Sequence, residues 1–239
     1  MANPLTTIRK DLKALRRLLK RRAYLSAQQE SDIVGRFHTL LYDSHIFHEG
    51  GDNVFWLGTP VTKNPFDLWI YQELLHEQRP DLIIECGTQD GGSAHFLASM
   101  CDLLGTGEVI TIDIAESDRR PRHPRITYLT GSSTSDAIVQ RVRGAAAGKR
   151  RVLAILDSDH SKKHVLEEMQ IYGPLVTPGS YLIVEDTNLN GNPVVPNFGP
   201  GPREAVEEFM ASNADFEIDP EREKFFLTFN PKGYLRKRG

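Results

Sequence analysis

The chain has 239 residues, of which 39% are hydrophobic and 26% are charged, and its formal net charge is −3 at pH 7. This size and composition fit one globular domain with a sizeable core and a helical extension. The near-neutral charge supplies no positive field for a phosphate backbone, so a nucleic-acid partner is not expected. A small molecule is the expected partner.

The cysteine content and the length of the apolar runs indicate the cellular compartment. Cys86 and Cys101 are the two cysteines, which excludes a disulfide framework and a thiolate zinc site. The longest apolar runs, Val152–Leu156 and Tyr181–Val184, fall far below the roughly 20 residues that a bilayer crossing requires. The basic N-terminus has no apolar core behind it, unlike a secretory signal. We therefore expect a cytoplasmic protein without a membrane partner.

The first 63 residues are expected to form a helical extension and a lid segment, ahead of a core domain at residues 64–239. Apolar residues recur at helical spacing among basic ones at Ile8, Leu12, Leu15 and Leu19. This pattern predicts an amphipathic helix that packs on its own or a neighbouring subunit, and an arm for acidic partners or a membrane is the alternative. A homo-oligomer is expected. A second helix is predicted at Ser31–Tyr42, and the irregular segment Asp43–Lys63 is a candidate lid.

From Pro80 onward, short β-rich runs alternate with helical windows. Strands are expected at Leu82–Cys86, Val109–Asp113, Ile126–Leu129, Val152–Asp157 and Tyr181–Glu185. Helices are expected at Ser93–Leu104, Ser135–Ala147, Lys163–Tyr172 and Arg203–Ala211. This alternation predicts an α/β fold with a doubly wound, Rossmann-like, mostly parallel sheet. A last pair of runs, Phe216–Ile218 and Lys224–Phe229, is too close together for a crossover and predicts an antiparallel hairpin at the sheet edge.

The first predicted strand ends in a glycine-rich turn that opens a helix. Residues 85–93 read ECGTQDGGS, and ligands of open α/β sheets bind outside the carboxyl ends of the strands. Glycines let the backbone approach a ligand closely, and Glu85 can accept a hydrogen bond from an ammonium group. The spacing differs from G-x-G-x-x-G, which counts against a nicotinamide dinucleotide. A purely structural need for glycine in this turn is the alternative.

The next two strand ends offer polar groups to a nucleoside. Asp113 ends the second strand, where a carboxylate can bind both hydroxyls of a ribose. After the third strand the sequence GSSTSD places Ser132 and Ser133 either at an adenine edge or at the cap of the next helix. Both interpretations stay open at this point.

Acidic residues follow the fourth and fifth strands. Asp157 is followed closely by Asp159 and His160, and Glu185 is followed by Asp186. A single crossover helix fits between these strands, so the carboxylates should converge at one edge of the sheet. Converging acids raise one another's pKa unless a cation neutralises them, and oxygen ligands favour Mg²⁺. His160 is a candidate base, and a solvated acidic rim is the alternative.

The chain resembles the cephalosporin hydroxylase and rhamnosyl O-methyltransferase family of class I S-adenosylmethionine-dependent methyltransferases. The resemblance rests on five motifs in order: KNPFDLWIYQELL, IIECGTQDGGSA, LDSDHSKKHVLEEM, IVEDTNLNG and FNPKGYLRK. It runs from Trp56 through Asp186 and continues to the C-terminal motif. In many methyltransferases an acid stands at the position of Ser132, so the adenine contacts of this chain differ from theirs.

The resemblance implies S-adenosylmethionine and Mg²⁺ as cofactors. It implies Asp157, Glu185 and Asp186 as metal ligands, and His160 as the base, with Asp157 beside it and Asp159 as the less favoured base. The expected cofactor-binding residues are Glu85, Gly87, Thr88, Gly91, Ser93, Asp113, Ser132, Ser133 and Asp157.

The expected reaction is O-methylation of a small-molecule hydroxyl, on a deoxysugar of a natural product such as an antibiotic. Methyl transfer requires an oxygen aligned in line with the sulfonium carbon, and a magnesium ion both orients vicinal oxygens and acidifies them. One alternative is a metal-dependent hydroxylase, although iron oxygenases usually use two histidines and a carboxylate. A non-catalytic nucleotide-binding or sugar-binding protein of the same fold is another alternative, but all three acids are retained.

Overall fold

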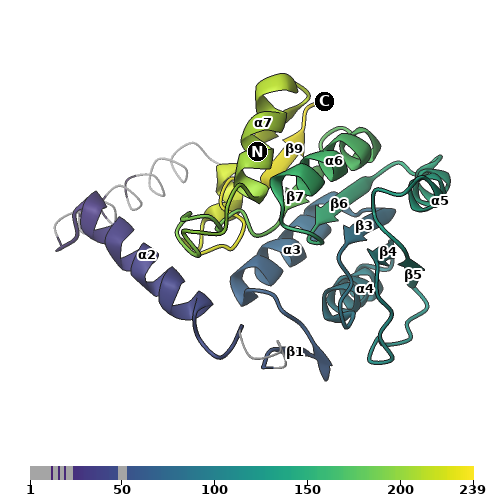
Figure 1. The fold of residues 1–239 in the computed structure, drawn as a ribbon, viewed down its shortest axis with the longest axis horizontal. Coiled ribbons are helices and arrows are strands. Elements are labelled where there is room, and N and C mark those ends of the chain that lie inside the picture. The colour runs from purple at the N-terminus through teal and green to yellow at the C-terminus, as the bar shows by residue number, and fades with distance from the viewer. Residues whose placement is uncertain (1–11, 13–15, 17–18, 20–23, 48–52) are drawn as a thin grey trace.

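The fold is given by a computed structural model, which describes residues 12, 16, 19, 24–47 and 53–239. The expected amphipathic helix around residues 8–19 lies almost entirely outside the described residues. Helix α2 (Ala27–Tyr42) begins at a capping box, in which the side chains and backbone amides of Ser26 and Gln29 bond reciprocally. This confirms the predicted second helix and extends it toward the N-terminus. In Figure 1, α2 stands to the left of α3, outside the layers of the main domain.

The central sheet of the described residues has seven strands in the order β5-β4-β3-β6-β7-β9-β8 (Figure 1). The strands are β3 (Leu82–Cys86), β4 (Glu108–Asp113), β5 (Ile126–Thr130), β6 (Val152–Leu156), β7 (Tyr181–Val184), β8 (Phe216–Ile218) and β9 (Tyr234–Lys237). The strands from β5 to β7 are parallel, whereas β9 is antiparallel to both β7 and β8. The order reverses between β3 and β6, as in a doubly wound sheet, so the predicted fold class is confirmed.

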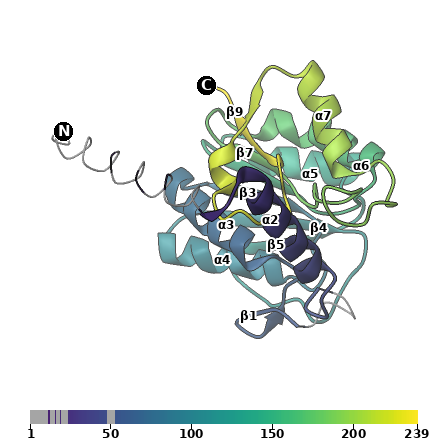
Figure 2. The ribbon, with the colours of Figure 1, turned by 90° about the vertical axis from the view of Figure 1, so that its left-hand side faces the viewer.

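Helices cover both faces of this sheet (Figures 1 and 2). They are α3 (Pro65–Gln78) and α4 (Gly92–Leu104) on one face, and α5 (Asp136–Ala146), α6 (Lys162–Tyr172) and α7 (Pro202–Ser212) on the other. Alternate strand residues divide between the faces: Ile83 and Ile155 pack with α3 and α4, whereas Ile84 and Ala154 pack with α5 to α7. Because both faces are buried, the inner strands read as continuous apolar runs in the sequence.

The C-terminal hairpin is confirmed, but the predicted position of its second strand is wrong. The partner of β8 is β9, whereas residues 224–229 form a loop. The hydroxyl of Thr228 and the backbone amide of Phe229 donate to the carboxylate of Asp67 in α3. The ring of Phe229 stacks on His38 of α2, with 5.5 Å between ring centroids. Thr228 and Phe229 are therefore buried against helices rather than in a strand ladder.

Several elements have no counterpart among the predicted ones. Strands β1 (Phe55–Trp56) and β2 (Thr59–Pro60) form a small antiparallel pair ahead of α3. Helix α3 begins after Asn64, whose side chain accepts from the amide of Phe66, and it has Pro65 at its first position. Two short 3₁₀ helices, η1 (Gly173–Leu175) and η2 (Pro220–Glu223), complete the fold. None of the helices in the described residues has the length and apolar character that a membrane crossing needs.

Candidate active site

A cavity of about 780 Å³ lies at the carboxyl ends of strands β3 to β7. Its walls are the turns that follow these strands, together with the stretch 60–63 ahead of α3. The predicted site residues that line it are Gly87, Thr88, Ser93, Asp113, Ser132, Ser133, Asp157, Asp159, His160 and Asp186. Glu85, Gly91 and Glu185 are not among its lining residues. Most of the predicted site residues therefore meet at one cavity.

Gly87 allows the glycine turn to lie directly against Asp157, at the end of β6. Its φ is +99°, and a β-carbon there would lie 1.8 Å from the carbonyl oxygen of Asp157. The backbone amide of Asp157 donates to the carbonyl of Cys86 over 2.8 Å. A side chain at position 87 would force β3 and β6 apart. Gly91, with a φ of +81°, adopts the left-handed conformation that begins α4.

Asp113 holds the glycine turn in place. Its Oδ2 accepts from the backbone amides of Thr88 and Gln89 over 3.0 and 2.8 Å, and its Oδ1 accepts from the amide of Ala115 over 3.0 Å. A carboxylate has about four acceptor positions, so these three bonds leave one for a ligand of the cavity that Asp113 lines, and the guanidinium of Arg120 lies 3.7 Å from Oδ2. The residue predicted for the ribose is therefore also the anchor of the turn.

Two buried polar atoms beside this turn lack a partner within the protein. They are Oε1 of Glu85 and Oγ of Ser93. The other carboxylate oxygen of Glu85 accepts from the hydroxyl of Thr111 over 2.6 Å. Burial raises the pKa of Glu85, and the positive charge of Lys63 and the nearby hydroxyls of Ser93 and Thr111 oppose that rise. Unpaired buried atoms of this kind are rare in folded proteins, and they fit a polar ligand group at the turn.

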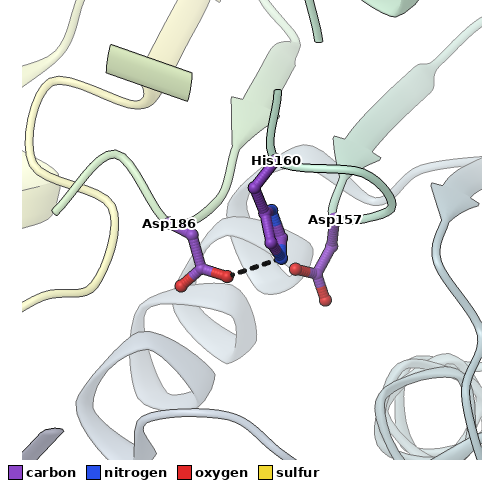
Figure 3. Close-up of side chains that lie close together, drawn as sticks. All are labelled: Asp157, His160 and Asp186. Atoms are coloured by element: carbon purple, nitrogen blue, oxygen red, sulfur yellow. Dashed lines mark ion pairs between the residues drawn. The ribbon is translucent and has the colours of Figure 1, made fainter. Parts of the chain in front are cut away.

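Asp157, His160 and Asp186 come together at the ends of β6 and β7 (Figure 3). One potential ligand atom from each lies within 4.8 Å of the others. The Nε2 atom of His160 lies 3.1 Å from Oδ2 of Asp186. Helix α6 begins at Lys162, one residue before its predicted start, so His160 belongs to the preceding turn. Two acids and the candidate base thus share one small volume.

Glu185 lies on the inner side of this cluster and has two partners from outside the strand ends. Its Oε1 accepts from the hydroxyl of Tyr71 over 2.6 Å and lies 2.6 Å from Nζ of Lys63. The Lys63 ammonium also contacts the carboxylate of Asp157. Lys63 is 4% exposed. The ammonium therefore bridges two of the three acids predicted as metal ligands.

The charges in this cluster shift one another's protonation. Burial raises the pKa of Asp157, Glu185 and Asp186, and repulsion between neighbouring acids adds to the rise, while Lys63 opposes it. Burial disfavours the charged form of His160, but Asp186 and Asp157 outweigh it and raise the pKa of the imidazole. The buried acids of this cluster outnumber its buried cations. A divalent cation would stabilise their negative charge.

Asp159 has a structural contact that competes with a role as base. Its Oδ1 accepts from the backbone amide of Ser161 over 2.7 Å, and Ser161 in turn caps α6. The hydrogen bonds from Ser161 lower the pKa of Asp159. A carboxylate of low basicity is a poor proton acceptor for a hydroxyl, which favours His160 over Asp159.

The sequence reasoning did not identify Lys63, Tyr71, His164 or Glu168, which contact the predicted site residues. Lys63 and Tyr71 both stand in the motif KNPFDLWIYQELL, so the motif itself was the available signal. Glu168 is fully buried on α6 and accepts from the hydroxyl of Ser133 over 2.5 Å. A glutamate on a buried helix face is visible in the sequence only once the apolar stripe of α6 is located.

Comparisons with known proteins show the family of this chain. The profile of the Rhamnosyl O-methyltransferase/CmcI family matches residues 50–238. The Rhamnosyl O-methyltransferase of Mycobacterium leprae is 41% identical over 214 residues, covering 86% of this chain and 91% of the relative. Its counterpart from Mycobacterium tuberculosis is 43% identical over 189 residues, covering 75% of this chain and 76% of the relative.

Solved structures of CmcI have the same fold. The apo form and the form with Mg-SAM each superpose with a TM-score of 0.62 at 21% identity, covering 80% of this chain and 79% of CmcI. The sequence match spans nearly all of the main domain, and both Mycobacterium relatives are covered over most of their length. The chain belongs to the Rhamnosyl O-methyltransferase/CmcI family, as its motifs indicated.

Proposed function

We propose that this protein transfers a methyl group from S-adenosylmethionine to a sugar hydroxyl and depends on Mg²⁺. The observation that carries the proposal is the meeting of Asp157, His160 and Asp186 on the wall of the cavity that the glycine turn also lines. The names of the Mycobacterium relatives and the Mg-SAM form of CmcI support the same reaction.

The glycine turn fits the amino acid and ribose parts of the cofactor. Ser93 Oγ and Glu85 Oε1 are buried without partners, and an ammonium group and its carboxylate are groups that could satisfy such atoms. Asp113 retains acceptor capacity toward the cavity for a ribose hydroxyl. When bound, S-adenosylmethionine supplies an electrophilic methyl group on a sulfonium centre. The chain's task is to align an acceptor oxygen with that carbon.

The acidic cluster fits a hard divalent cation. Asp157, Glu185 and Asp186 would hold Mg²⁺ through oxygen atoms, the ligand type that this ion prefers. Oε1 of Glu185 already contacts Lys63 and Tyr71, so we assign Oε2 to the metal. When bound, Mg²⁺ stabilises negative charge on neighbouring hydroxyl oxygens of an acceptor and fixes their direction.

His160 would remove the proton of the acceptor hydroxyl. Its Nε2 faces Asp186, lies in the acidic cluster and reaches the cavity wall. The acids stabilise the imidazolium that forms when the proton arrives, as the raised pKa indicates. Asp157 would act beside it by holding the cation that orients the acceptor.

The acceptor we propose is a glycosylated natural product with vicinal sugar hydroxyls, such as a rhamnoside. The relatives' names support the sugar. On the basis of the two free cysteines, we expect a cytoplasmic protein. On the basis of the N-terminal leucine pattern, we expect a homo-oligomer. We also retain the division into an extension at residues 1–63 and a methyltransferase domain at residues 64–239.

Labelled methyl transfer tests the proposal. The purified full chain would be incubated with methyl-labelled S-adenosylmethionine and a panel of synthetic rhamnosides, with Mg²⁺ or with excess chelator. We expect label in at least one rhamnoside with a free vicinal diol, and its loss on chelation. In Asp157→Asn, adding Mg²⁺ should no longer increase methyl transfer, while calorimetry should still detect binding of S-adenosylhomocysteine. Undiminished transfer under chelator would contradict the metal dependence, and lack of cofactor binding would contradict the whole proposal.

The hydroxylase alternative has less support from the geometry. The cluster offers two aspartates and one histidine, whereas the facial site of iron oxygenases uses two histidines and one carboxylate. The nearest further histidine on this wall, His164, is engaged with Glu168 and Ser133.

A further inference from the structure

A second polar cluster lies on the cavity wall, apart from the acidic one. Ser133 follows β5, Ser158 follows β6, and His164 lies in the first turn of α6. All three line the cavity. Behind them stands Glu168, which has no exposed surface. This cluster carries no role in the reaction described above.

Glu168 fixes the direction of both serine hydroxyls. Its Oε1 accepts from Ser133 Oγ over 2.5 Å and from Ser158 Oγ over 2.7 Å. A carboxylate only accepts, and a hydroxyl has one hydrogen, so both hydrogens point away from the cavity. The lone pairs of the two oxygens are then the groups that a ligand meets. At Ser133 and Ser158, the cavity wall therefore accepts hydrogen bonds.

Two further contacts hold this arrangement. His164 Nε2 lies 3.1 Å from Ser133 Oγ and 3.4 Å from Glu168 Oε1, so with its hydrogen on Nε2 the imidazole donates into the cluster. The hydroxyl of Tyr172 donates to the backbone carbonyl of Ser133 over 2.5 Å. An acid buried among apolar helix residues is costly unless it is bonded, and the bonds to Glu168 all reach Oε1, since Oε2 is buried without a partner.

The neighbouring part of the cavity suits a flat ring. Ile114 comes directly after Asp113, lines the cavity and is 78% exposed. A large aliphatic side chain left open beside a ribose site is a surface on which a purine ring can lie. A base attached to a ribose at Asp113 would then direct one edge toward the turns after β5 and β6.

We propose that Glu168 is a positioning residue, which presents the hydroxyl oxygens of Ser133 and Ser158 as acceptors for the 6-amino group of the cofactor's adenine. This inference rests on the proposed function, since it concerns the base of the same cofactor. Many methyltransferases have an acid at the position of Ser132, whereas here the acceptors would be Ser133 and Ser158, whose hydroxyl direction is set by Glu168 of α6.

The test compares two ligands that differ on one edge of the base. S-adenosylhomocysteine carries a 6-amino group and an unprotonated N1, whereas S-inosylhomocysteine carries a hydrogen on N1 and a 6-oxo group, which would be an acceptor facing acceptors. Calorimetry on the wild-type chain should show about tenfold tighter binding of the adenosyl ligand, the typical size of one well-placed hydrogen bond. Equal affinities would overturn the inference while leaving the proposed function standing. Failure to bind either ligand would overturn both.

Three variants separate positioning from general packing. Ser133→Ala should reduce the preference to below about threefold, because one acceptor is lost. Glu168→Gln should reduce it further, because an amide can donate to a serine and turn the hydroxyl hydrogen toward the cavity. Glu167→Gln, the same chemical change on the exposed face of α6, should keep the wild-type preference.

Folding and metal binding supply the controls. Circular dichroism must show folded variants, and Mg²⁺ affinity should be unchanged in Ser133→Ala, which lies outside the acidic cluster. Should Glu168→Gln fail to fold, Ser133→Ala decides the matter. A folded Ser133→Ala that retains the full tenfold preference would overturn the inference.

Discussion

The ammonium group of Lys63 lies 2.6 Å from Oε1 of Glu185 and also contacts the carboxylate of Asp157. Lys63 precedes α3, whereas the two acids end β7 and β6. A cation from outside the sheet therefore joins two neighbouring strand ends. Burial disfavours the charged ammonium, but Asp157 and Glu185 outweigh it and raise its pKa. The Lys63 ammonium thus stays charged while it is buried.

Replacing Lys63 should destabilise the metal-free protein. Lys63→Met leaves two buried carboxylates without their cation, and removing one partner of a buried pair typically costs about 3–5 kcal/mol. Added Mg²⁺ should recover part of this loss, since it supplies positive charge to the same acids. Thermal unfolding with magnesium and with chelator measures both effects. Lys162→Met, which breaks an exposed pair with Glu208, should cost no more than about 1 kcal/mol. Equal stability of Lys63→Met and the parent protein would refute the expectation.

Replacing His160 should affect turnover and leave binding intact. His160→Ala removes the proposed proton acceptor, and general-base removal lowers rates by roughly 10²- to 10⁴-fold. Calorimetric affinity for S-adenosylhomocysteine should remain, and the defect should shrink at high pH, where the acceptor hydroxyl ionises without a protein base. The exposed His76 provides the matched control, His76→Ala, with wild-type turnover expected. A fully active His160→Ala would assign the base to another group.

Replacing Asp113 should weaken the cofactor. Asp113→Ala removes a charged acceptor at the ribose and also releases the amides of Thr88 and Gln89. We expect binding of S-adenosylhomocysteine to weaken by about 1.5–3 kcal/mol, the usual range for bonds to charged groups. Magnesium affinity should change little. The exposed Asp118→Ala serves as control, and calorimetry that finds Asp113→Ala equal to it would contradict the ribose assignment.

Gly87 should tolerate no side chain. In Gly87→Ala the new β-carbon would overlap the carbonyl oxygen of Asp157 at 1.8 Å, in addition to the strain of a φ of +99°. Gly105→Ala carries comparable strain at a φ of +70° but meets nothing within 4 Å. The difference in melting temperature between the two variants isolates the overlap. We expect Gly87→Ala to be much the less stable, and similar melting temperatures would show that β3 and β6 can separate freely.

His38 should make stability depend on pH. Burial lowers its pKa from 6.5 to about 4, so the folded protein holds the neutral imidazole. In the unfolded chain, the imidazole of His38 is protonated with its ordinary pKa of 6.5. The contribution of His38 to the free energy of unfolding is therefore fully present above pH 6.5. It declines as the pH falls toward 4, by up to about 3 kcal/mol. Urea unfolding at pH 7.5 and pH 5 should show less of this decline in His38→Gln. The exposed His45→Gln should behave like the parent protein.

The strand ends were predictable because their signals are local. Buried parallel strands read as apolar runs, and the first polar residue after each run marks the edge of the sheet. This rule places Asp113, Asp157 and Glu185 at the edge of the sheet, with Asp186 next to Glu185. Lys63 was not found, since it stands 94 residues before its partner Asp157 and no local pattern links them. The segment Lys224–Phe229 has the composition of a strand, yet its partners are α2 and α3.

The site described here is joined to the N-terminal part of the chain at two points. Lys63 reaches the acids, and a β-carbon on Gly92 would lie 2.0 Å from the carbonyl oxygen of Pro60, so this stretch sits tightly on the start of α4. Chimeras that exchange N-terminal segments between relatives would therefore have to cross over before Phe55. A junction at residue 64 would take the cation from one parent and its two carboxylates from the other.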